Sequence, residues 1–211
     1  MHTVTKSTIR KTGILDAALQ LLLEQGMESV SMDDIARKAG ISKGALYLEF
    51  DSKTDLILSI SARYSQLLNS QFSQALALSL SGLDILKEFG AIYLRFVHEN
   101  PLFMLTLHTY RRVILDGKLE TVPSAMVCKT LENDALTYVV RAAQIGIQDR
   151  SIVSKLDPKT LAMLIFAGFK GLTDLFNAAS ISTEQDSLRD LGDLEEMMKI
   201  FMDIMERGIS A

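Results

Sequence analysis

Residues 31–50 read SMDDIARKAGISKGALYLEF, and this stretch contains two helix starts separated by a glycine. Ser31 precedes two aspartates, which is the pattern of an N-cap and of a first helical turn whose dipole favours negative charge. Apolar residues at helical spacing follow until Gly40, which ends this short helix. Ser42 is a second N-cap, and the helix after it carries three apolar residues, Ala45, Leu46 and Phe50. The stretch therefore predicts two short helices joined by a tight glycine turn.

This arrangement matches a helix-turn-helix, in which the second helix enters the major groove of DNA with its N-terminal residues on the bases. Ala36 is small, which lets the two helices cross closely, and Ile41 is placed to fill the space between them. An ordinary helical hairpin without a role in DNA binding has the same spacing. The spacing alone leaves both interpretations open.

The rest of the chain also shows helical periodicity. Apolar residues in 14–22 follow the pattern of an amphipathic helix, which Gly26 would close as a left-handed residue. Ser52 is the N-cap of a fourth predicted helix that extends to about residue 78. The sequence therefore predicts an all-α fold, with a three-helix helix-turn-helix domain over residues 1–51 and a larger six-helix body over residues 52–211. The five further helices are expected at about 83–98, 102–115, 122–148, 158–178 and 190–207, with a polar connector at 180–189.

Composition and motif content exclude several classes of protein. The longest apolar run, Leu161–Phe169, is short of the roughly 18 residues that span a bilayer, so we expect a cytoplasmic protein with no membrane partner. The three histidines show no metal-binding spacing, no glycine-rich phosphate loop is present, and Cys128 is the single cysteine. We therefore expect no enzymatic activity, no cofactor and no metal site.

Charge does not decide whether nucleic acid is a partner. The formal net charge of the 211 residues is −4, which normally counts against binding to phosphate. Residues 1–55 hold seven basic and eight acidic residues and sum to −1. A face that binds DNA would therefore depend on how these charges are sorted in space.

Seven short stretches, 23 residues in all, resemble the N-terminal domain of TetR-type transcriptional repressors. The resemblance covers about residues 8–58, and the rest of the chain is similar to that family only in length, helix count and all-α character. The motif positions occur in the family's order, with no insertion or deletion between them. They are Ile14-Leu15-Asp16-Ala17-Ala18, Gly26, Ser31-Met32-Asp33-Asp34-Ile35-Ala36, Ala39-Gly40-Ile41-Ser42-Lys43-Gly44, Leu46-Tyr47, Phe50 and Ser52-Lys53.

The resemblance implies a homodimer that binds a double-stranded DNA operator through its first three helices. Ser31 would cap the second helix and hydrogen-bond a phosphate, while Tyr47 would hydrogen-bond the DNA backbone and Lys53 would pair with a phosphate. The start of the recognition helix, capped by Ser42, would face the bases. The residues that the resemblance assigns to DNA are thus Ser31, Ser42, Lys43, Gly44, Ala45, Tyr47 and Lys53.

Each assignment has a plainer alternative. Tyr47 is also compatible with a partly exposed core aromatic, and the two lysines of the set with ordinary solvated charges. Arg37 and Lys38 fit a solvated face better than a DNA contact. Whether Lys6, Arg10 and Lys11 form a basic arm near the DNA backbone stays open.

Leu48-Glu49 departs from the family pattern, which often has an aromatic residue or a histidine here. A carboxylate near phosphates costs electrostatic energy unless it accepts a hydrogen bond from a cytosine amino group. The recognition helix also carries few long polar side chains. We therefore expect base discrimination to rest on Lys43, on apolar contact with thymine methyl groups and on DNA shape.

The six-helix body is rich in large apolar side chains, as a site for a small hydrophobic or weakly polar effector would be. The candidate ligand-binding residues are Phe89, Tyr93, Phe96, Met104, His108, Met126 and Tyr138, and the alternative is that they form the core. The last two helices carry apolar groups on several faces and are predicted to form a two-fold dimer interface, for which an intramolecular core is the alternative.

These features together predict a ligand-responsive, sequence-specific transcriptional regulator, most simply a repressor released from a palindromic operator. The alternative is a helix-turn-helix protein without a small-molecule effector that a protein partner controls.

Overall fold

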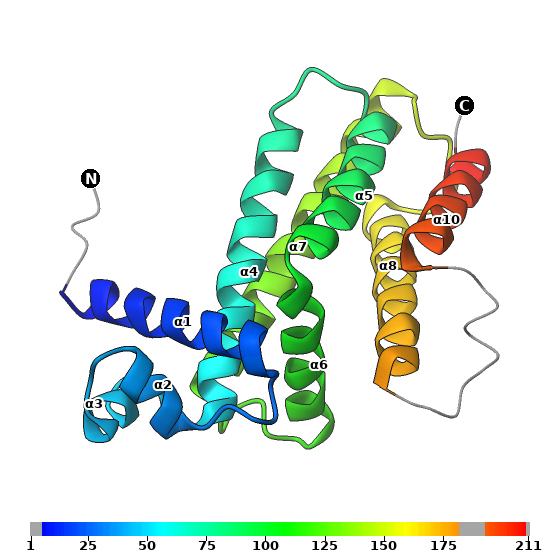
Figure 1. Ribbon diagram of the computed structural model, residues 1–211. Coiled ribbons are helices and arrows are strands. Elements are labelled where there is room, and N and C mark those ends of the chain that lie inside the picture. Colours follow the sequence, from blue (N-terminus) through cyan, green and yellow to red (C-terminus); the bar gives the residue numbers. More distant parts are fainter. Residues whose placement is uncertain (1–5, 182–192, 210–211) are drawn as a thin grey trace. The chain divides into compact units, whose positions relative to one another are not determined.

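The computed structural model of the chain describes residues 6–181 and 193–209, which form nine helices and no strand (Figure 1). The predicted all-α fold is thereby confirmed, and the described helix bounds lie within a few residues of those expected. The predicted connector at 180–189 falls mostly outside the described residues. The helices are α1 (Lys6–Gln25), α2 (Met32–Lys38), α3 (Lys43–Tyr47), α4 (Lys53–Leu76), α5 (Gly82–Glu99), α6 (Pro101–Leu115), α7 (Pro123–Asp149), α8 (Pro158–Ile181) and α10 (Leu194–Ile209).

The chain divides into two compact units. The first consists of the chain up to Tyr64 together with Leu105–Lys129, and the second consists of Ser65–Met104 and the chain from Thr130 onward. Helices α4, α6 and α7 each contribute residues to both units. These units are defined by compactness, so the functional division predicted at residue 51 stays a prediction.

Local hydrogen bonds explain why α2 and α3 begin and end where they do. Ser31 Oγ accepts from the Asp34 N–H at 3.2 Å, and the Asp34 carboxylate accepts from the Ser31 N–H at 3.0 Å, which is a capping box. After α2, Gly40 has a φ of +67°, and the N–H of Ile41 reaches back to the Ala36 carbonyl at 3.0 Å. This left-handed closure is favoured at glycine because a Cβ would be strained there.

The core of the first unit joins α1, α2 and α3. Ile14 and Leu22 of α1, Ile35 of α2 and Leu46 of α3 are at most 2 % exposed. Burying each such aliphatic side chain contributes about 1.5–3 kcal/mol relative to leaving it in water. Phe50, directly after α3, is also buried. This apolar layer holds one face of α3 and leaves its opposite face to solvent.

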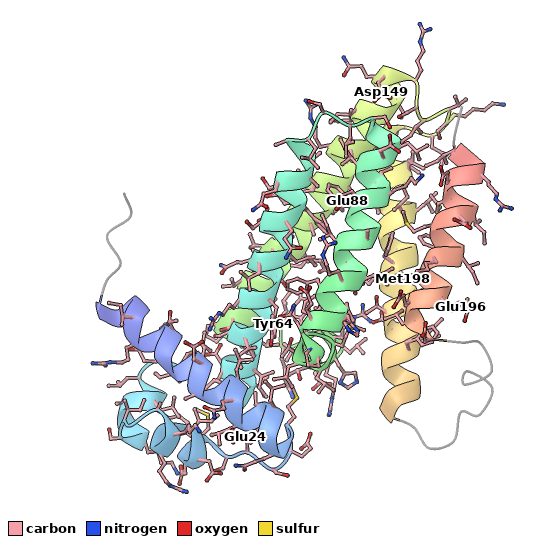
Figure 2. All side chains as sticks on the ribbon, turned by 45° about the horizontal axis from the view of Figure 1, so that its top comes forward. Glu24, Tyr64, Glu88, Asp149, Glu196 and Met198 are labelled. Atoms are coloured by element: carbon pink, nitrogen blue, oxygen red, sulfur yellow. The ribbon has the colours of Figure 1, made fainter. Side chains whose placement is uncertain are left out.

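In the second unit α5, α8 and α10 pack on one another, and α8 and α10 lie side by side (Figures 1 and 2). Met198 of α10 is fully buried, whereas Glu196 is exposed at the start of the same helix (Figure 2). The rings of Phe169 on α8 and Phe201 on α10 pack edge to face, with their centroids 5.4 Å apart. Gly168 makes this approach possible, because a Cβ there would lie 2.3 Å from the Phe201 ring. The glycine thus serves packing within the chain.

Candidate nucleic-acid interface

The N-terminal turn of α3 is open to solvent. Ser42, Lys43 and Gly44 are exposed and Ala45 is half-buried, while Leu46 on the opposite side is fully buried. Ser42 Oγ accepts from the Ala45 N–H at 3.1 Å, which confirms the predicted cap. No heavy atom lies within 4 Å of the place where a Cβ on Gly44 would stand. Four of the seven residues assigned to DNA therefore lie together on one accessible turn.

Lys43, the first residue of α3, has a partner that the sequence did not reveal. Its ammonium lies 2.7 Å from Oδ1 of Asp33 on α2, and this hydrogen bond raises the pKa of Lys43 above its ordinary value. Both side chains are more than half exposed, so the pair contributes little to stability. A weak exposed pair leaves the cation available to a phosphate or a base edge.

Tyr47 and Leu48 form the exposed C-terminal end of α3. Tyr47 is 44 % exposed, and Leu48 is 84 % exposed. A large aliphatic side chain so open to water on a helix of five residues adds an apolar patch beside the polar first turn. The apolar contact with thymine methyl groups that the sequence predicts stays a prediction, and Leu48 is an exposed apolar residue beside the first turn of α3.

Ser31 and Lys53 both have partners within the chain. The Ser31 hydroxyl donates to Asp34 Oδ2 at 2.5 Å, so a bond from this hydroxyl to a phosphate requires its proton to turn away from Asp34. Lys53 Nζ donates to the Met27 carbonyl at 2.5 Å, which holds the side chain against the segment after α1. An ammonium has three donors, so two remain for other acceptors. The phosphate contacts of both residues stay predictions.

The sequence leaves Glu49 as either an uncompensated charge near phosphates or an acceptor for a cytosine amino group. Its surroundings in the structure differ from both. Its side chain is only 11 % exposed and lies between two cations of α1, with Arg10 at 3.7 Å and Lys11 at 3.8 Å. The Lys11 ammonium also stands over the Phe50 ring, 5.7 Å from its centroid. Nearly forty residues separate the carboxylate from these partners, so no local pattern could have indicated the pairing.

Asp55 is a buried carboxylate that the sequence did not single out. It is 4 % exposed, and Oδ1 accepts from the Ser124 N–H at the start of α7 at 2.9 Å. Oδ2 accepts from the Asp51 N–H at 3.2 Å, just after the end of the recognition-helix segment. A second bond, between the hydroxyls of Ser59 and Ser124 at 2.7 Å, joins the same two helices. One carboxylate therefore ties the exit of α3 to the N-terminus of α7 within the first unit.

The structure divides the candidate ligand-binding residues between the two units. Phe89 and Phe96 are buried in the second unit, where Tyr93 Oη lies 2.8 Å from Thr173 Oγ1. Met104 and Tyr138, also in the second unit, are half-buried. The two remaining candidates, the half-buried His108 and the 46 % exposed Met126, lie in the first unit. The assignment of these seven residues to an effector stays a prediction.

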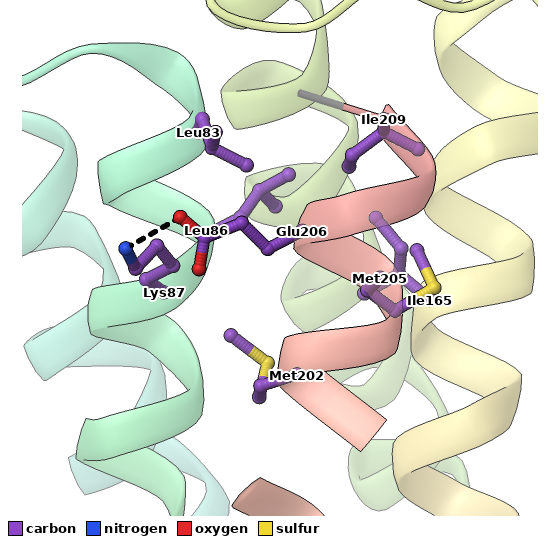
Figure 3. Close-up of a pocket in the computed structure, with 8 residues that line it drawn as sticks. All are labelled: Leu83, Leu86, Lys87, Ile165, Met202, Met205, Glu206 and Ile209. Carbon is purple, nitrogen blue, oxygen red and sulfur yellow. Dashed lines mark hydrogen bonds and ion pairs between the residues drawn. The ribbon is translucent and has the colours of Figure 1, made fainter. Parts of the chain in front are cut away.

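A small depression lies between α5, α8 and α10 of the second unit (Figure 3). It is shallow and open to solvent, with room for about one water molecule. Lys87 closes one side through a bond to Glu206 at 2.9 Å, and this bond raises the pKa of Lys87. None of its lining residues was predicted from the sequence. They are Leu83, Leu86, Lys87, Ile165, Met202, Met205, Glu206 and Ile209.

Part of the apolar surface of α8 and α10 faces solvent. On α8 the exposed residues Leu164, Ala167, Gly171 and Leu175 recur every three or four residues and form a stripe, and on α10 the exposed Ile200 and Ile204 lie one turn apart. Nothing lies within 4 Å of a Cβ built on Gly171, in the middle of the α8 stripe. The large exposed apolar residues are Met163, Leu164 and Leu175 on α8 and Ile200 and Ile204 on α10, each between 45 % and 63 % exposed.

Two further features concern metals and membranes. Among the described residues no helix is both long and apolar enough to span a bilayer. The same part of the chain contains no group of three histidine, cysteine or acidic side chains arranged to hold a metal ion.

Comparison with known sequences places the family match within the first unit. Residues 14–60 match the family model described as bacterial regulatory proteins, tetR family. SrpR of Pseudomonas putida, an HTH-type transcriptional regulator, is 32 % identical, with 50 % of this chain and 62 % of that protein covered. The HTH-type transcriptional activator FasR of Mycolicibacterium smegmatis is 31 % identical, with 62 % and 57 % covered. The chain thus spans less than two thirds of these relatives.

Solved structures extend the likeness in fold to nearly the whole chain. PfmR, a TetR family transcriptional regulator from Thermus thermophilus, superposes with a TM-score of 0.63 at 19 % identity, covering 92 % of this chain and 97 % of that one. FadR from Bacillus subtilis, solved with stearoyl-CoA, gives a TM-score of 0.66 at 16 % identity, with 94 % and 98 % covered. At such low identity these matches show a shared fold.

Proposed function

Because this chain belongs to the TetR family of transcriptional regulators, we propose that it is a sequence-specific repressor that a small effector releases from its operator. The observation that carries the proposal is the open first turn of α3, where Ser42, Lys43 and Gly44 are exposed beside a buried Leu46. Its free helical N–H groups and one cation are the chemistry that the major groove and its phosphates require. The protein acts on cytoplasmic DNA as a binding protein and not as an enzyme.

Base reading in this proposal is divided between polar and apolar side chains. Lys43 approaches a base edge or phosphate, Leu48 contacts thymine methyl groups, and Tyr47 with Lys53 holds the DNA backbone. Ser31 and Ser42 present the N-termini of α2 and α3, and the small Gly44 and Ala45 let the helix enter deeply. Few long polar groups take part, so DNA shape contributes to the choice of sequence.

The protein is proposed to bind as a homodimer through the exposed stripes of α8 and α10. The two helices pack on each other, and each carries large apolar residues that face solvent. Exposed apolar surface of this kind marks an interaction site. A two-fold axis between two such helix pairs would give a four-helix contact and two recognition helices, which suits a palindromic operator.

The effector is proposed to be hydrophobic or weakly polar. The aromatic side chains of the second unit support this class, because Tyr93, Phe96 and Phe103 pack edge to face around one polar pair, Tyr93 with Thr173. The fold is also that of FadR, which was solved with stearoyl-CoA. Release requires that the effector bind the DNA-free state more tightly, because the DNA affinity falls only by that difference.

Selection of bound fragments from a random pool of duplex DNA tests the DNA-binding part of the proposal. The expected result is a palindrome whose half-sites are centred about 34–36 Å apart, one helical turn. The same duplex, labelled with a fluorophore, then reports release by candidate effectors such as fatty acids and their thioesters. A folded dimer that enriches no sequence contradicts the proposal.

A further inference from the structure

Glu49 carries a negative charge close to the surface that is proposed to meet DNA. It lies in the turn directly after α3, six residues along the chain from Lys43. The Debye length at physiological salt is about 8 Å, so phosphates beside the recognition helix would feel an uncompensated charge here. A bare carboxylate at this position would therefore oppose DNA binding.

The structure shows that this carboxylate is compensated. Each of its two oxygens faces one cation, Oε1 towards Arg10 and Oε2 towards Lys11, and only 11 % of the side chain is exposed. The cations remain about half exposed themselves, at 54 % and 50 %. Lys11 has a second contact that fixes its direction, namely the face of the Phe50 ring. The three charges sum to +1, and the exposed part of the group is cationic.

We propose that Arg10, Lys11 and Glu49 form a charge-compensated unit in which α1 neutralises the acidic end of the recognition helix. Its residual positive charge contacts the DNA backbone. This inference rests on the proposed function and adds to it residues that the family resemblance did not assign to DNA. It also gives Glu49 a role different from reading cytosine, because a carboxylate enclosed by two cations is not free to accept from a base.

Three variants test the unit on the selected operator duplex: Glu49→Gln, the double variant Arg10→Gln with Lys11→Gln, and the triple variant. The affinity is measured by fluorescence anisotropy at several salt concentrations. Because the charge of Glu49 is already compensated, Glu49→Gln alone should change Kd less than about threefold. The double variant should bind on the order of tenfold more weakly, with a shallower salt dependence, because it bares the carboxylate and loses a backbone contact. Adding Glu49→Gln to it should recover much of that loss.

The matched control is an exposed ion pair outside the helix-turn-helix and outside α8 and α10, where Lys118 Nζ lies 3.2 Å from Asp116 Oδ2. Lys118→Gln, alone or with Asp116→Asn, should leave the operator Kd and its salt dependence at wild-type values. Glutamine keeps the helix propensity, and thermal melting confirms that every variant is folded at the assay temperature.

The outcomes separate this inference from the proposed function. If the wild-type protein binds no duplex, the proposed function itself fails. If the wild-type protein binds but Glu49→Gln raises the affinity tenfold or more, the carboxylate is uncompensated and the inference is wrong. It is equally wrong if the triple variant binds no better than the double variant, or if Glu49→Gln changes the preference at one base pair only.

Discussion

Lys43 is the side chain on which the proposed reading of bases depends most. It begins α3, pairs with the exposed Asp33, and so exchanges one acceptor for another when DNA arrives. Lys53 differs, because its ammonium already donates a hydrogen bond to the Met27 carbonyl, which fixes the position of the side chain. The two lysines should therefore respond differently to removal.

Lys43→Ala should weaken operator binding by about 1–3 kcal/mol and relax the preference for one base pair. Lys53→Ala and Tyr47→Phe should instead weaken binding to all sequences about equally, because they contact the backbone. Lys53→Ala should also lower the slope of log K against log salt by about 0.9. Anisotropy titrations with operator and single-substituted duplexes measure both quantities. An unchanged affinity and slope for Lys53→Ala would show that this lysine is not at the DNA.

The capping box at the start of α2 makes a prediction about pH. The hydrogen bonds from Ser31 to the Asp34 carboxylate hold the pKa of Asp34 below its ordinary value. A carboxyl whose pKa is lower in the folded state stabilises the fold above the unfolded pKa, and this contribution is lost as the pH falls through the folded pKa. Asp34→Asn should therefore destabilise the protein at pH 6, and its difference from wild type should shrink below pH 4. Urea unfolding at several pH values checks this, with Asp51→Asn as the control, and a difference independent of pH would refute it.

Among the helices, α4 and α7 are joined by their first turns. Asp55 accepts from backbone N–H groups on both sides, at Asp51 after α3 and at Ser124 in α7. The positive end of the α7 dipole adds to the attraction. Through this carboxylate the position of the recognition helix depends on the position of α7.

Asp55→Asn should reduce the free energy of unfolding by about 1–3 kcal/mol, because one of the two buried N–H groups would face an amide N–H₂ instead of an acceptor. Asp51→Asn, the same change on an exposed side chain four residues earlier, should have an effect within about 0.5 kcal/mol. Urea denaturation gives both values, and hydrogen exchange of the Ser124 amide locates the loss. Equal effects of the two substitutions would show that the hydrogen bonds of Asp55 to Asp51 and Ser124 do not stabilise the fold.

The helices and caps were predictable because their signals are local. Ser31, Gly40 and Ser42 act through neighbours within about four residues, so the two helix caps and the glycine turn could be read directly from the sequence and are confirmed. Glu49 and Asp55 were not predictable, because their partners come from α1 and α7, far away along the chain. Gly168 shows the same limit, since a small residue on an apolar helix does not reveal whether its own chain or a second copy fills the space.

For the whole molecule, the exposed stripes of α8 and α10 predict a dimer. Leu164→Glu together with Ile204→Glu should place charges in the interface and convert the dimer to a monomer without unfolding it, because both side chains are more than half exposed. Leu78→Glu, on a 53 % exposed leucine after α4, is the control and should remain dimeric. Sedimentation velocity distinguishes the species. If the double variant at Leu164 and Ile204 stays dimeric, the interface lies elsewhere.

The central claim is that the protein distinguishes one DNA sequence from others, and the ratio of two affinities tests it most directly. Anisotropy at physiological salt should be measured with the selected palindrome and with a scrambled duplex of equal length and composition. We expect the palindrome to bind at least about 10³-fold more tightly, with two protomers per duplex. A ratio near one would contradict the account, because it would leave only a general attraction to phosphate.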